Sequence, residues 1–513
     1  MKTLIVLACV FLSEKVFARK WEDQMDRASL VLEEIGERIE LPVFVRSQRC
    51  SDCAFLPLRT REFEIINSTS QIGWIDTRWP SQFQFKLKDG EIRESNFINF
   101  AENTIFSFKI GENSDFAFQE SPQKSEDSSS LQQIGALAIF AGFIWKLNSF
   151  LDAENRGREP VVDTWRGINV AFMVFVNYGG GGYWWLQHSP WDGITLADLV
   201  MPSFLFLNGI SIALRKKSTK RRNLKRFVKT FFLGLIVSNK GKLLSLNFDF
   251  ANWRIPGVLQ RIAICELIVS VLSFSNFALL TGVLLFYFLW WSIYFLATPF
   301  DLPSCPASYN GPGGISSNSQ FFHCIGGSSG AIDRFFLGNS HLYQWSTAKG
   351  VFYPEEHFKN QPIVFDPEGI TGTFSSILTV FFGFVAVKIL RKMESFQRRT
   401  FLLGIGSILI LIGVNRASTV PFNKNLWSDS FVFFTAGFNF LALLFLLDFS
   451  FPLFARLGRR SMFVYVGHTF LRGYFPFSWN SSLPPTHASI FSENLFATCL
   501  WLVLGNIFES FSS

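Results

Sequence analysis

The run from Asn177 to His188 holds the residue types most suited to chemistry. It reads Asn-Tyr-Gly-Gly-Gly-Gly-Tyr-Trp-Trp-Leu-Gln-His. An imidazole with a pKa of about 6.5 can accept a proton near neutral pH, and glycines let backbone approach a ligand closely. The same run fits an interfacial turn with an aromatic belt formed by Tyr183, Trp184, Trp185 and Trp191. Both interpretations stay open on these residues alone.

Several ionisable residues lie within or beside apolar segments. They are Asp198, Arg254, Arg261 and His468. Charged groups at membrane depth are costly, and they usually pair with one another or bind a ligand. A structural Asp–Arg pair is the alternative interpretation for Asp198. Arg254 lies nearer the end of its segment, so it could instead extend its guanidinium to water.

The composition indicates a membrane protein. The chain has 513 residues, of which 49% are hydrophobic, with 62 Phe and 15 Trp. This is too apolar over too much of its length for soluble domains. The formal charge of +7 comes from Lys and Arg that cluster between long apolar runs. Such clusters are typical of membrane topology, and they argue against a nucleic-acid partner.

Hydropathy predicts a multi-pass α-helical membrane protein with about eleven transmembrane helices. They lie near 131–150, 167–183, 195–214, 227–239, 256–274, 276–298, 370–390, 400–415, 427–449, 460–474 and 491–508. Basic residues crowd three connections, at 215–226, 388–399 and 456–460. All three fall on one side if the first helix leaves the lumen, so that side is predicted to be cytosolic.

The segment before the first helix is predicted to lie in the lumen. Residues 1–18 resemble a cleavable signal peptide, because a Lys near the start precedes an apolar stretch and the segment ends on the small residue Ala18. The alternative of a retained membrane anchor is disfavoured, since the apolar stretch is too short to span a bilayer. In residues 19–130, alternating runs at 83–87 and 106–110 predict short strands of a small β domain, followed by a Ser-rich linker. The transmembrane domain then occupies 131–513. Asn67 in the β domain and Asn480 in a later luminal connection are predicted glycosylation sites.

The cysteines outside the helices form two candidate pairs. Cys50 and Cys53 form a CxxC that could be redox-active, a zinc half-site or a structural disulfide. The disulfide is favoured, because the domain has no second Cys pair and the compartment is oxidising. Cys305 and Cys324 lie in a long luminal connection at 299–369, where they are candidates for another disulfide. A loop of this length is usually functional, and it could shape the mouth of a substrate pocket.

Ordered sequence blocks resemble the heparan-alpha-glucosaminide N-acetyltransferases, a family of lysosomal transmembrane acetyltransferases. The resemblance extends over about residues 160–480. It rests on VDTWRGI at 162–168, the run at 177–188, WDGITLADLV at 191–200, RIPGVLQR at 254–261, DPEGI at 366–370, NKNLW at 423–427 and VYVGH at 464–468.

The resemblance implies an acyltransferase. It would move acetyl from cytosolic acetyl-CoA, a co-substrate, to the terminal non-reducing α-glucosamine of heparan sulfate in the lysosomal lumen, during heparan sulfate degradation. His188 falls on the family's catalytic histidine, and Asn177 on the asparagine that accompanies it. The candidate substrate- or coenzyme-binding residues are Asp198, Arg254, Arg261, Asn425 and His468. The resemblance implies a homodimer in the lysosomal membrane, and no metal is expected.

The implied chemistry suits these residues. A glucosamine amine must lose its proton before it attacks a thioester, so His188 is expected to be the base, or to carry the acetyl group covalently. Asn177 could hold the thioester oxygen or orient the imidazole. The coenzyme phosphates would stay near cytosolic basic groups while the thioester reaches the luminal histidine. This requires a pore through the bundle.

Departures from the family pattern keep two other functions open. Val161, Gly182 and Ser203 replace a serine, a basic residue and a tryptophan of the family. A catalytically silent relative is therefore one alternative. A transporter of a small polar solute is the other, in which the glycine break and the buried charges form the solute site.

Overall fold

The computed structural model describes the membrane domain and much of the N-terminal domain. The described residues are 27–32, 39–50, 52–60, 71–87, 91–100, 105–110, 116–121, 129–149, 160–215, 219–246, 248–302, 304–353, 364–449, 451–472 and 486–510. The predicted signal peptide at 1–18 and the sequons at Asn67 and Asn480 lie outside them.

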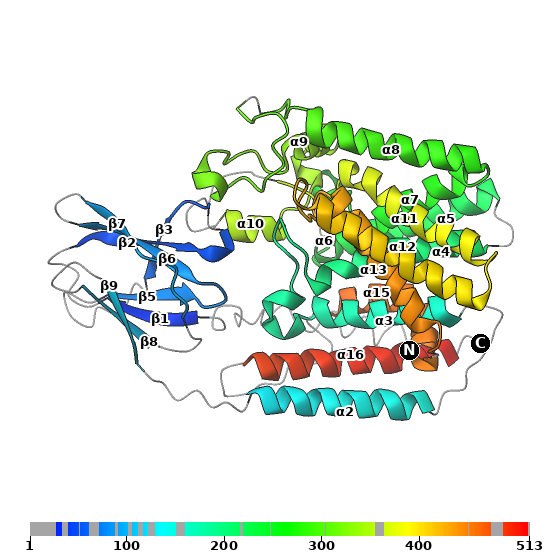
Figure 1. Cartoon of the computed structure of the whole chain (residues 1–513), viewed down its shortest axis with the longest axis horizontal. Helices are drawn as coiled ribbons and strands as arrows, with labels where there is room; N and C mark the ends of the chain where they lie inside the picture. The colour runs from blue at the N-terminus through cyan, green and yellow to red at the C-terminus, as the bar shows by residue number, and fades with distance from the viewer. Residues whose placement is uncertain are drawn as a thin grey trace.

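The N-terminal domain is built from two sheets that share one apolar core (Figure 1). The strands are β1 (Arg27–Leu32), β2 (Ile39–Ser47), β3 (Leu56–Pro57), β4 (Arg59–Thr60), β5 (Gln71–Asp76), β6 (Ser81–Leu87), β7 (Ile92–Glu94), β8 (Ile105–Ile110) and β9 (Phe116–Ser121). Their orders are β4-β5-β1-β8-β9 and β3-β2-β6-β7, and β1 pairs with β8 in parallel. In β6, Phe83, Phe85 and Leu87 are buried at alternate positions. The strands predicted at 83–87 and 106–110 are confirmed.

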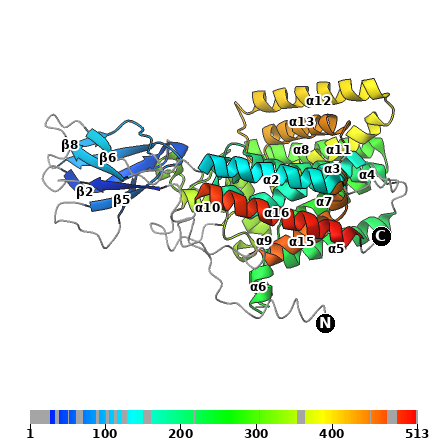
Figure 2. The same cartoon turned by 90° about the horizontal axis from the view of Figure 1, so that it is seen from below.

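A bundle of helices forms the rest of the molecule (Figure 1). Its long helices are α2 (Ser129–Ser149), α3 (Pro160–Asn177), α4 (Val200–Leu214), α5 (Lys220–Ser238), α7 (Val258–Leu272), α8 (Asn276–Leu296), α11 (Ile370–Leu390), α12 (Ser395–Arg416), α13 (Asp429–Leu446) and α16 (His487–Ser510). Shorter ones are α6 (Lys240–Leu244), α9 (Gly327–Leu337), α10 (Thr347–Phe352), α14 (Pro452–Arg459) and α15 (Ser461–Leu471). Figure 2 shows α12 and α13 side by side on one flank of the bundle, and α2 beside α16.

Six helical segments in the described residues are long and apolar enough to cross a membrane. They are 196–214, 276–296, 370–390, 395–416, 429–446 and 487–508. A helix lies at every one of the predicted positions, but the other segments are too short or too polar to qualify by the same measure. The multi-pass helical class is therefore confirmed, whereas the count of about eleven spans stays a prediction.

Two predicted helices have different bounds in the structure. The second helix begins at Pro160 and ends at Asn177, not 167–183, because Asp163 and Arg166 hide its start from a hydropathy scan. The glycines counted into its end have positive φ and leave the helix. The helix predicted at 460–474 corresponds to α15, which spans Ser461–Leu471. The shorter helix α14 comes just before it, and only Arg460 separates the two.

The centre of the bundle depends on close packing between α4 and α11. A Cβ on Gly209 would lie 1.9 Å from the Val380 carbonyl oxygen, and one on Gly383 would lie 1.9 Å from that of Phe206. Small residues allow helix backbones to approach this closely in membrane proteins. The two helices therefore form a fixed wall, and α3 and α7 pack against α4.

The two ends of the bundle differ in charge. At the basic end, Arg391 after α11 donates to the Ala213 carbonyl near the end of α4, and Arg399 of α12 pairs with Asp448 after α13. The first contact brings two of the basic connections together, and Arg459 of the third cluster lines the same cavity as Arg226 of the first. The other end, called the loop end, carries residues 299–302, 304–353 and 364–369 and the N-terminal domain (Figure 1).

Both predicted disulfides are present at the loop end. Cys50 is bonded to Cys53, and Cys305 is bonded to Cys324. The Cys50–Cys53 bond uses both sulfurs, so neither can bind zinc in this state.

Candidate active site

The glycine run turns the chain sharply after α3. Gly179 to Gly182 all have positive φ, between 57° and 121°. A Cβ on Gly181 would lie 2.9 Å from the Phe491 Cβ, so the turn also leaves no room for a side chain. Two short 3-10 turns follow, η4 (Gly180–Gly182) and η5 (Trp184–Leu186), and they lead the chain to His188. The segment is therefore a tight turn, and its backbone carries no side chains that would keep a ligand away. Both interpretations of the glycine run fit this geometry.

His188 lies against a buried carboxylate and a lysine. Its Nδ1 is 2.8 Å from Asp198 Oδ1 and 3.0 Å from Lys424 Nζ. Lys424 Nζ is also 3.5 Å from Asp198 Oδ1. The other carboxylate oxygen, Oδ2, accepts from the backbone N–H groups of Ser189 and Thr195, each at 3.1 Å. Asp198 therefore pairs with a histidine and a lysine, not with an arginine.

These neighbours set the protonation of His188. Burial lowers the pKa of His188, and the positive charge of Lys424 lowers it further, whereas the hydrogen bond that Asp198 accepts from the ring raises it. The neutral ring is favoured. When Nδ1 carries the proton it donates to Asp198, and Nε2 keeps a lone pair. The His188 side chain remains 38% exposed, so this lone pair can reach a substrate.

Asn177 is held by a second histidine. His468 Nδ1 lies 2.9 Å from the Val464 carbonyl, to which it donates, so its Nε2 accepts from Asn177 Nδ2 at 2.9 Å. Asn177 thus hydrogen-bonds His468 and not His188. One amide N–H of Asn177 is used, and the other can still donate.

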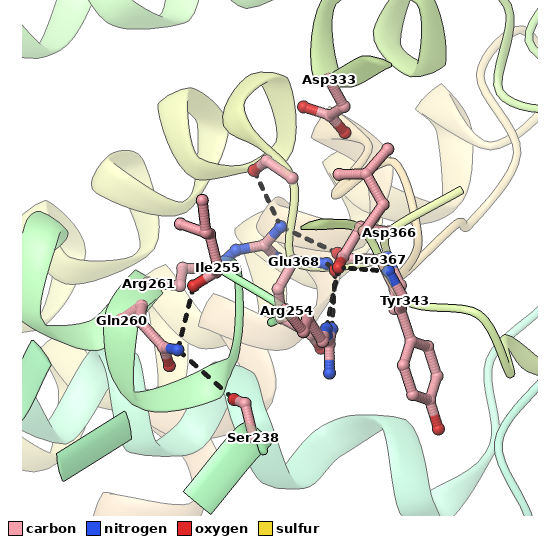
Figure 3. A network of polar contacts seen from close by, with 12 residues as sticks. Ser238, Arg254, Ile255, Gln260, Arg261, Asp333, Tyr343, Asp366, Pro367 and Glu368 are labelled. Atoms are coloured by element: carbon pink, nitrogen blue, oxygen red, sulfur yellow. Dashed lines mark hydrogen bonds and ion pairs between the residues drawn. The ribbon is translucent and has the colours of Figure 1, made fainter. Parts of the chain in front are cut away.

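Arg254 belongs to an ion-pair network at the loop end (Figure 3). It donates to Asp366 Oδ1 at 2.6 Å and to Asp366 Oδ2 at 2.8 Å, and its Nη2 lies 2.5 Å from Glu368 Oε2. Its guanidinium also lies 4.2 Å from the Tyr343 ring centre. The two carboxylates raise the pKa of Arg254, and Arg254 in turn lowers that of Glu368 despite burial. The alternative in which Arg254 extends to water is wrong, because the network holds it inside.

Two further predicted site residues, Arg261 and Asn425, hydrogen-bond backbone carbonyl groups in this part of the structure. Arg261 donates from Nη2 to the carbonyls of Pro367 at 2.8 Å and Gly369 at 3.3 Å. Its Nε and Nη1 have no hydrogen-bond partner among the described residues. Asn425 donates to the Pro190 carbonyl at 3.0 Å and so fastens the segment that carries His188. Arg261 is therefore a buried support, whereas Asn425 is close to the candidate base.

Asp333 lies beside the same network. It is buried in α9, and its Oδ1 accepts from the Ile370 backbone N–H at 2.8 Å, at the start of α11. Burial raises the pKa of Asp333 to about 8, and the nearby Asp366 charge raises it too. The group is therefore protonated under acidic conditions.

One cavity of about 540 Å³ connects this group of residues to the basic end. Its loop-end lining includes Asn177, His188, Arg254, Glu368, Lys424 and Asn425. Its basic-end lining includes Arg166, Ser211, Arg226, Glu266 and Arg459. Arg166 and Asn177 are eleven residues apart on α3, which is about 16 Å along a helix axis. The lining therefore extends along α3 over a distance that is more than half the thickness of a hydrocarbon core, about 30 Å.

The structure brings together some predicted residues and adds others. The cavity is lined by four of the predicted residues, Asn177, His188, Arg254 and Asn425. The other three, Asp198, Arg261 and His468, are not in the lining but hydrogen-bond residues of this region. Sequence reasoning missed Lys424, Asp366 and Glu368 as site residues. Each of these three residues is charged and comes shortly before an apolar helix at the loop end. This was the only signal in the sequence, and it was weak, because a charged residue in that position is as often solvated as buried in a site.

The fold and the site together define a class. This is a polytopic helical membrane protein in which a cavity through the bundle leads from basic side chains to a histidine, a carboxylate and a lysine. A site of this kind can take a proton from a substrate held at its loop end.

Comparison with known proteins agrees with the predicted resemblance. Residues 158–310 match the family model described as heparan-alpha-glucosaminide N-acetyltransferase, catalytic. The mouse heparan-alpha-glucosaminide N-acetyltransferase is 35% identical over 408 residues, 69% of this chain and 60% of that protein. The human protein of the same name is 35% identical over 400 residues, 67% of this chain and 58% of that protein. The resemblance to this family is confirmed, and the chain spans about 60% of the length of these curated relatives.

Proposed function

We propose that this protein transfers an acetyl group from acetyl-CoA to the amine of a terminal α-glucosamine of heparan sulfate. The observation that carries the proposal is the continuous cavity that joins the basic end to His188. The names of the relatives support the reaction. The matched region at 158–310 includes His188, Asp198, Arg254 and Arg261.

The proposed orientation places the basic end in the cytosol and the loop end in the lysosomal lumen. Lys and Arg cluster at the α4–α5 and α11–α12 connections and at the end of α14, and these clusters favour a cytosolic side. The disulfides Cys50–Cys53 and Cys305–Cys324, at the opposite end, favour an oxidising compartment. The proposal therefore has the acetyl group cross the membrane within the protein.

The lining of the cavity suits acetyl-CoA. At the basic end, Arg166, Arg226 and Arg459 offer guanidinium groups, which bind phosphates through paired hydrogen bonds. Glu266 faces Arg226 at 3.0 Å and limits the net charge there. Between the two ends the wall is mostly apolar, which suits the slender arm of the coenzyme. The apolar lining includes Met173, Val176, Val200, Phe204, Val258 and Ile262.

The proposed chemistry uses groups at the loop end. The glucosamine ammonium gives a proton to His188 Nε2, and its nitrogen then attacks the thioester carbonyl carbon. The carbon–sulfur bond breaks as the amide forms, and the coenzyme leaves as a thiol after taking up a proton. Asp198 keeps the ring in the tautomer that accepts the proton, and Asn177 offers an amide N–H to the developing oxyanion. Transfer of acetyl first to His188 is the two-step form of the same reaction.

The direct test is acetyl transfer by the purified full-length protein. Radiolabelled acetyl-CoA and a glucosamine-terminated heparan fragment should give labelled N-acetylated sugar. His188→Ala should lower the rate by at least about 10²-fold while acetyl-CoA binding persists, since removal of a general base costs on this order. A wild-type protein that binds acetyl-CoA without turnover would instead be the silent relative. Uptake of solute without transfer would identify the transporter.

A further inference from the structure

A second cavity also reaches His188. It has a volume of about 430 Å³ and lies between the N-terminal domain and the loop end of the bundle. His188 and Ser189 line both cavities. The imidazole therefore sits at a junction, with the bundle cavity on one side and a space bounded by the N-terminal domain on the other.

The walls of this second cavity are held in place by specific contacts. Asp52, in the loop closed by the Cys50–Cys53 disulfide, accepts from the backbone N–H of Ser317 at 3.2 Å. The Asp52 carbonyl accepts from Asn318 N–H at 2.8 Å, and Ala54 N–H donates to the Ile315 carbonyl at 2.8 Å. The N-terminal domain is thus fastened to the 299–369 loop beside the cavity.

An aromatic pair forms part of the lining. Trp79 of the N-terminal domain and Trp184 of the His188 segment lie with ring centres 5.2 Å apart and planes tilted by 54°. Both line the second cavity. Trp184 is 46% exposed, so much of its ring can still contact a ligand. Exposed indole faces beside a polar cavity are well suited to the apolar face of a sugar ring.

The lining also contains an arginine available to an anion. Arg78 is engaged by Asp76 through bonds of 2.6 and 3.0 Å. Arg49 lines the cavity, and within the described part of the chain its guanidinium makes no hydrogen bond or ion pair. Partial burial and the charge of Arg78 lower the pKa of Arg49, and the nearby carboxylate of Asp76 opposes them only in part. A bound oxyanion would relieve both effects.

We propose that this second cavity binds the acceptor chain beyond its reacting amine. Arg49 pairs with the carboxylate or sulfate of the sugar that follows the terminal glucosamine, and Trp79 with Trp184 packs against a sugar ring. The N-terminal domain thereby selects an anionic oligosaccharide over an isolated amino sugar. This inference rests on the proposed function, because it assigns the acceptor side of the same site.

The test compares two acceptors with the full-length protein. One is a disaccharide of glucosamine linked to an unsulfated uronate, and the other is methyl α-glucosaminide, which is neutral beyond its amine. Arg49→Gln should reduce the preference for the disaccharide, measured as the ratio of the two kcat/KM values, by about tenfold. That change corresponds to the loss of one hydrogen bond to a charged group. The KM for acetyl-CoA should not change.

Two variants complete the design. Arg49→Lys keeps the charge and should lose less preference than Arg49→Gln. Arg93→Gln removes an arginine that pairs with Glu91 elsewhere in the same domain and should match the wild type. A 2-O-sulfated form of the disaccharide separates sulfate from carboxylate recognition: a larger effect of Arg49→Gln on it assigns the arginine to sulfate.

The outcomes separate this inference from the proposed function. If the wild type acetylates neither acceptor, the proposed function fails. If it acetylates both and Arg49→Gln keeps the wild-type preference, the acceptor site is overturned while the proposed function stands. Trp79→Ala gives an independent reading, since it should raise the KM for the disaccharide. An unchanged KM would remove the aromatic pair from the site.

Discussion

The clearest prediction concerns the charge that Lys424 places next to the candidate base. Lys424→Met removes the ammonium but keeps a side chain of similar length. Without that charge the pKa of His188 should rise, because Asp198 alone then faces Nδ1 and favours the protonated ring. A base of higher pKa is protonated over more of the acidic range. The acid limb of the kcat/KM profile should therefore move to higher pH.

The magnitude follows from the contact distance. Two unit charges at 3.0 Å interact by about 1.4 kcal/mol even at the dielectric constant of water, ~80. The water value is the conservative choice, because the His188 side chain is 38% exposed. A pKa change of one unit corresponds to about 1.4 kcal/mol. The acid limb should therefore shift upward by about one pH unit.

The assay is acetyl transfer across the acidic to neutral range, with the midpoint of the acid limb as the readout. Lys424→Arg keeps the charge and should leave the midpoint near its wild-type value. Lys349→Met removes a lysine of the loop end that contacts the Trp345 ring, and it serves as the matched control. The reasoning is refuted if the Lys424→Met midpoint stays in place or moves to lower pH.

Three further predictions follow from other contacts. Asn177→Ala should lower the rate, and His468→Ala should lower it too, because it removes the 2.9 Å hydrogen bond that holds Asn177. In the kinetics of the double variant the two losses should not add. Additive losses would mean that the two residues have separate roles. Asp333, with a pKa raised to about 8, contributes stability that is lost as pH rises from about 4 to 8. Thermal unfolding of Asp333→Asn in detergent should therefore depend less on pH than that of the wild type, and equal slopes would contradict this. Endoglycosidase should shift the mobility of the protein, and Asn480→Gln should reduce the shift; a cytosol-accessible tag at 480 would reject the proposed orientation.

Hydropathy predicted the helical membrane domain well because long apolar segments have few other stable structures in a bilayer. Hydropathy gave wrong bounds at helix ends, because polar residues and glycines with positive φ determine where a helix begins and ends. Asp163 and Arg166 form an ion pair at 2.7 Å across the first two turns of α3, so the start of this helix looks polar in sequence. The glycines after Asn177 look apolar, yet their positive φ ends the helix.

The site was predicted in part for a related reason. The resemblance identified His188 and Asn177, and membrane cost singled out Asp198, Arg254, Arg261 and His468. The pairing among these charges could not be predicted, because it depends on which helices are neighbours. Lys424 reaches His188 across 236 residues, and nothing local to either one indicates that contact.

The ion-pair network of Arg254 has a consequence for how the protein is made. Arg254 precedes its partner Asp366 by 112 residues. At about 5–20 residues per second, the ribosome needs on the order of 10 s to synthesise that interval. During this time Arg254 and Arg261 have no hydrogen-bond partners from residues 366–369, because that segment has not yet been synthesised. We therefore expect α7 to stay near the translocon or with a chaperone until residues 366–369 are made. Substitution of Asp366 would then reduce the yield of inserted protein before any effect on turnover could be measured.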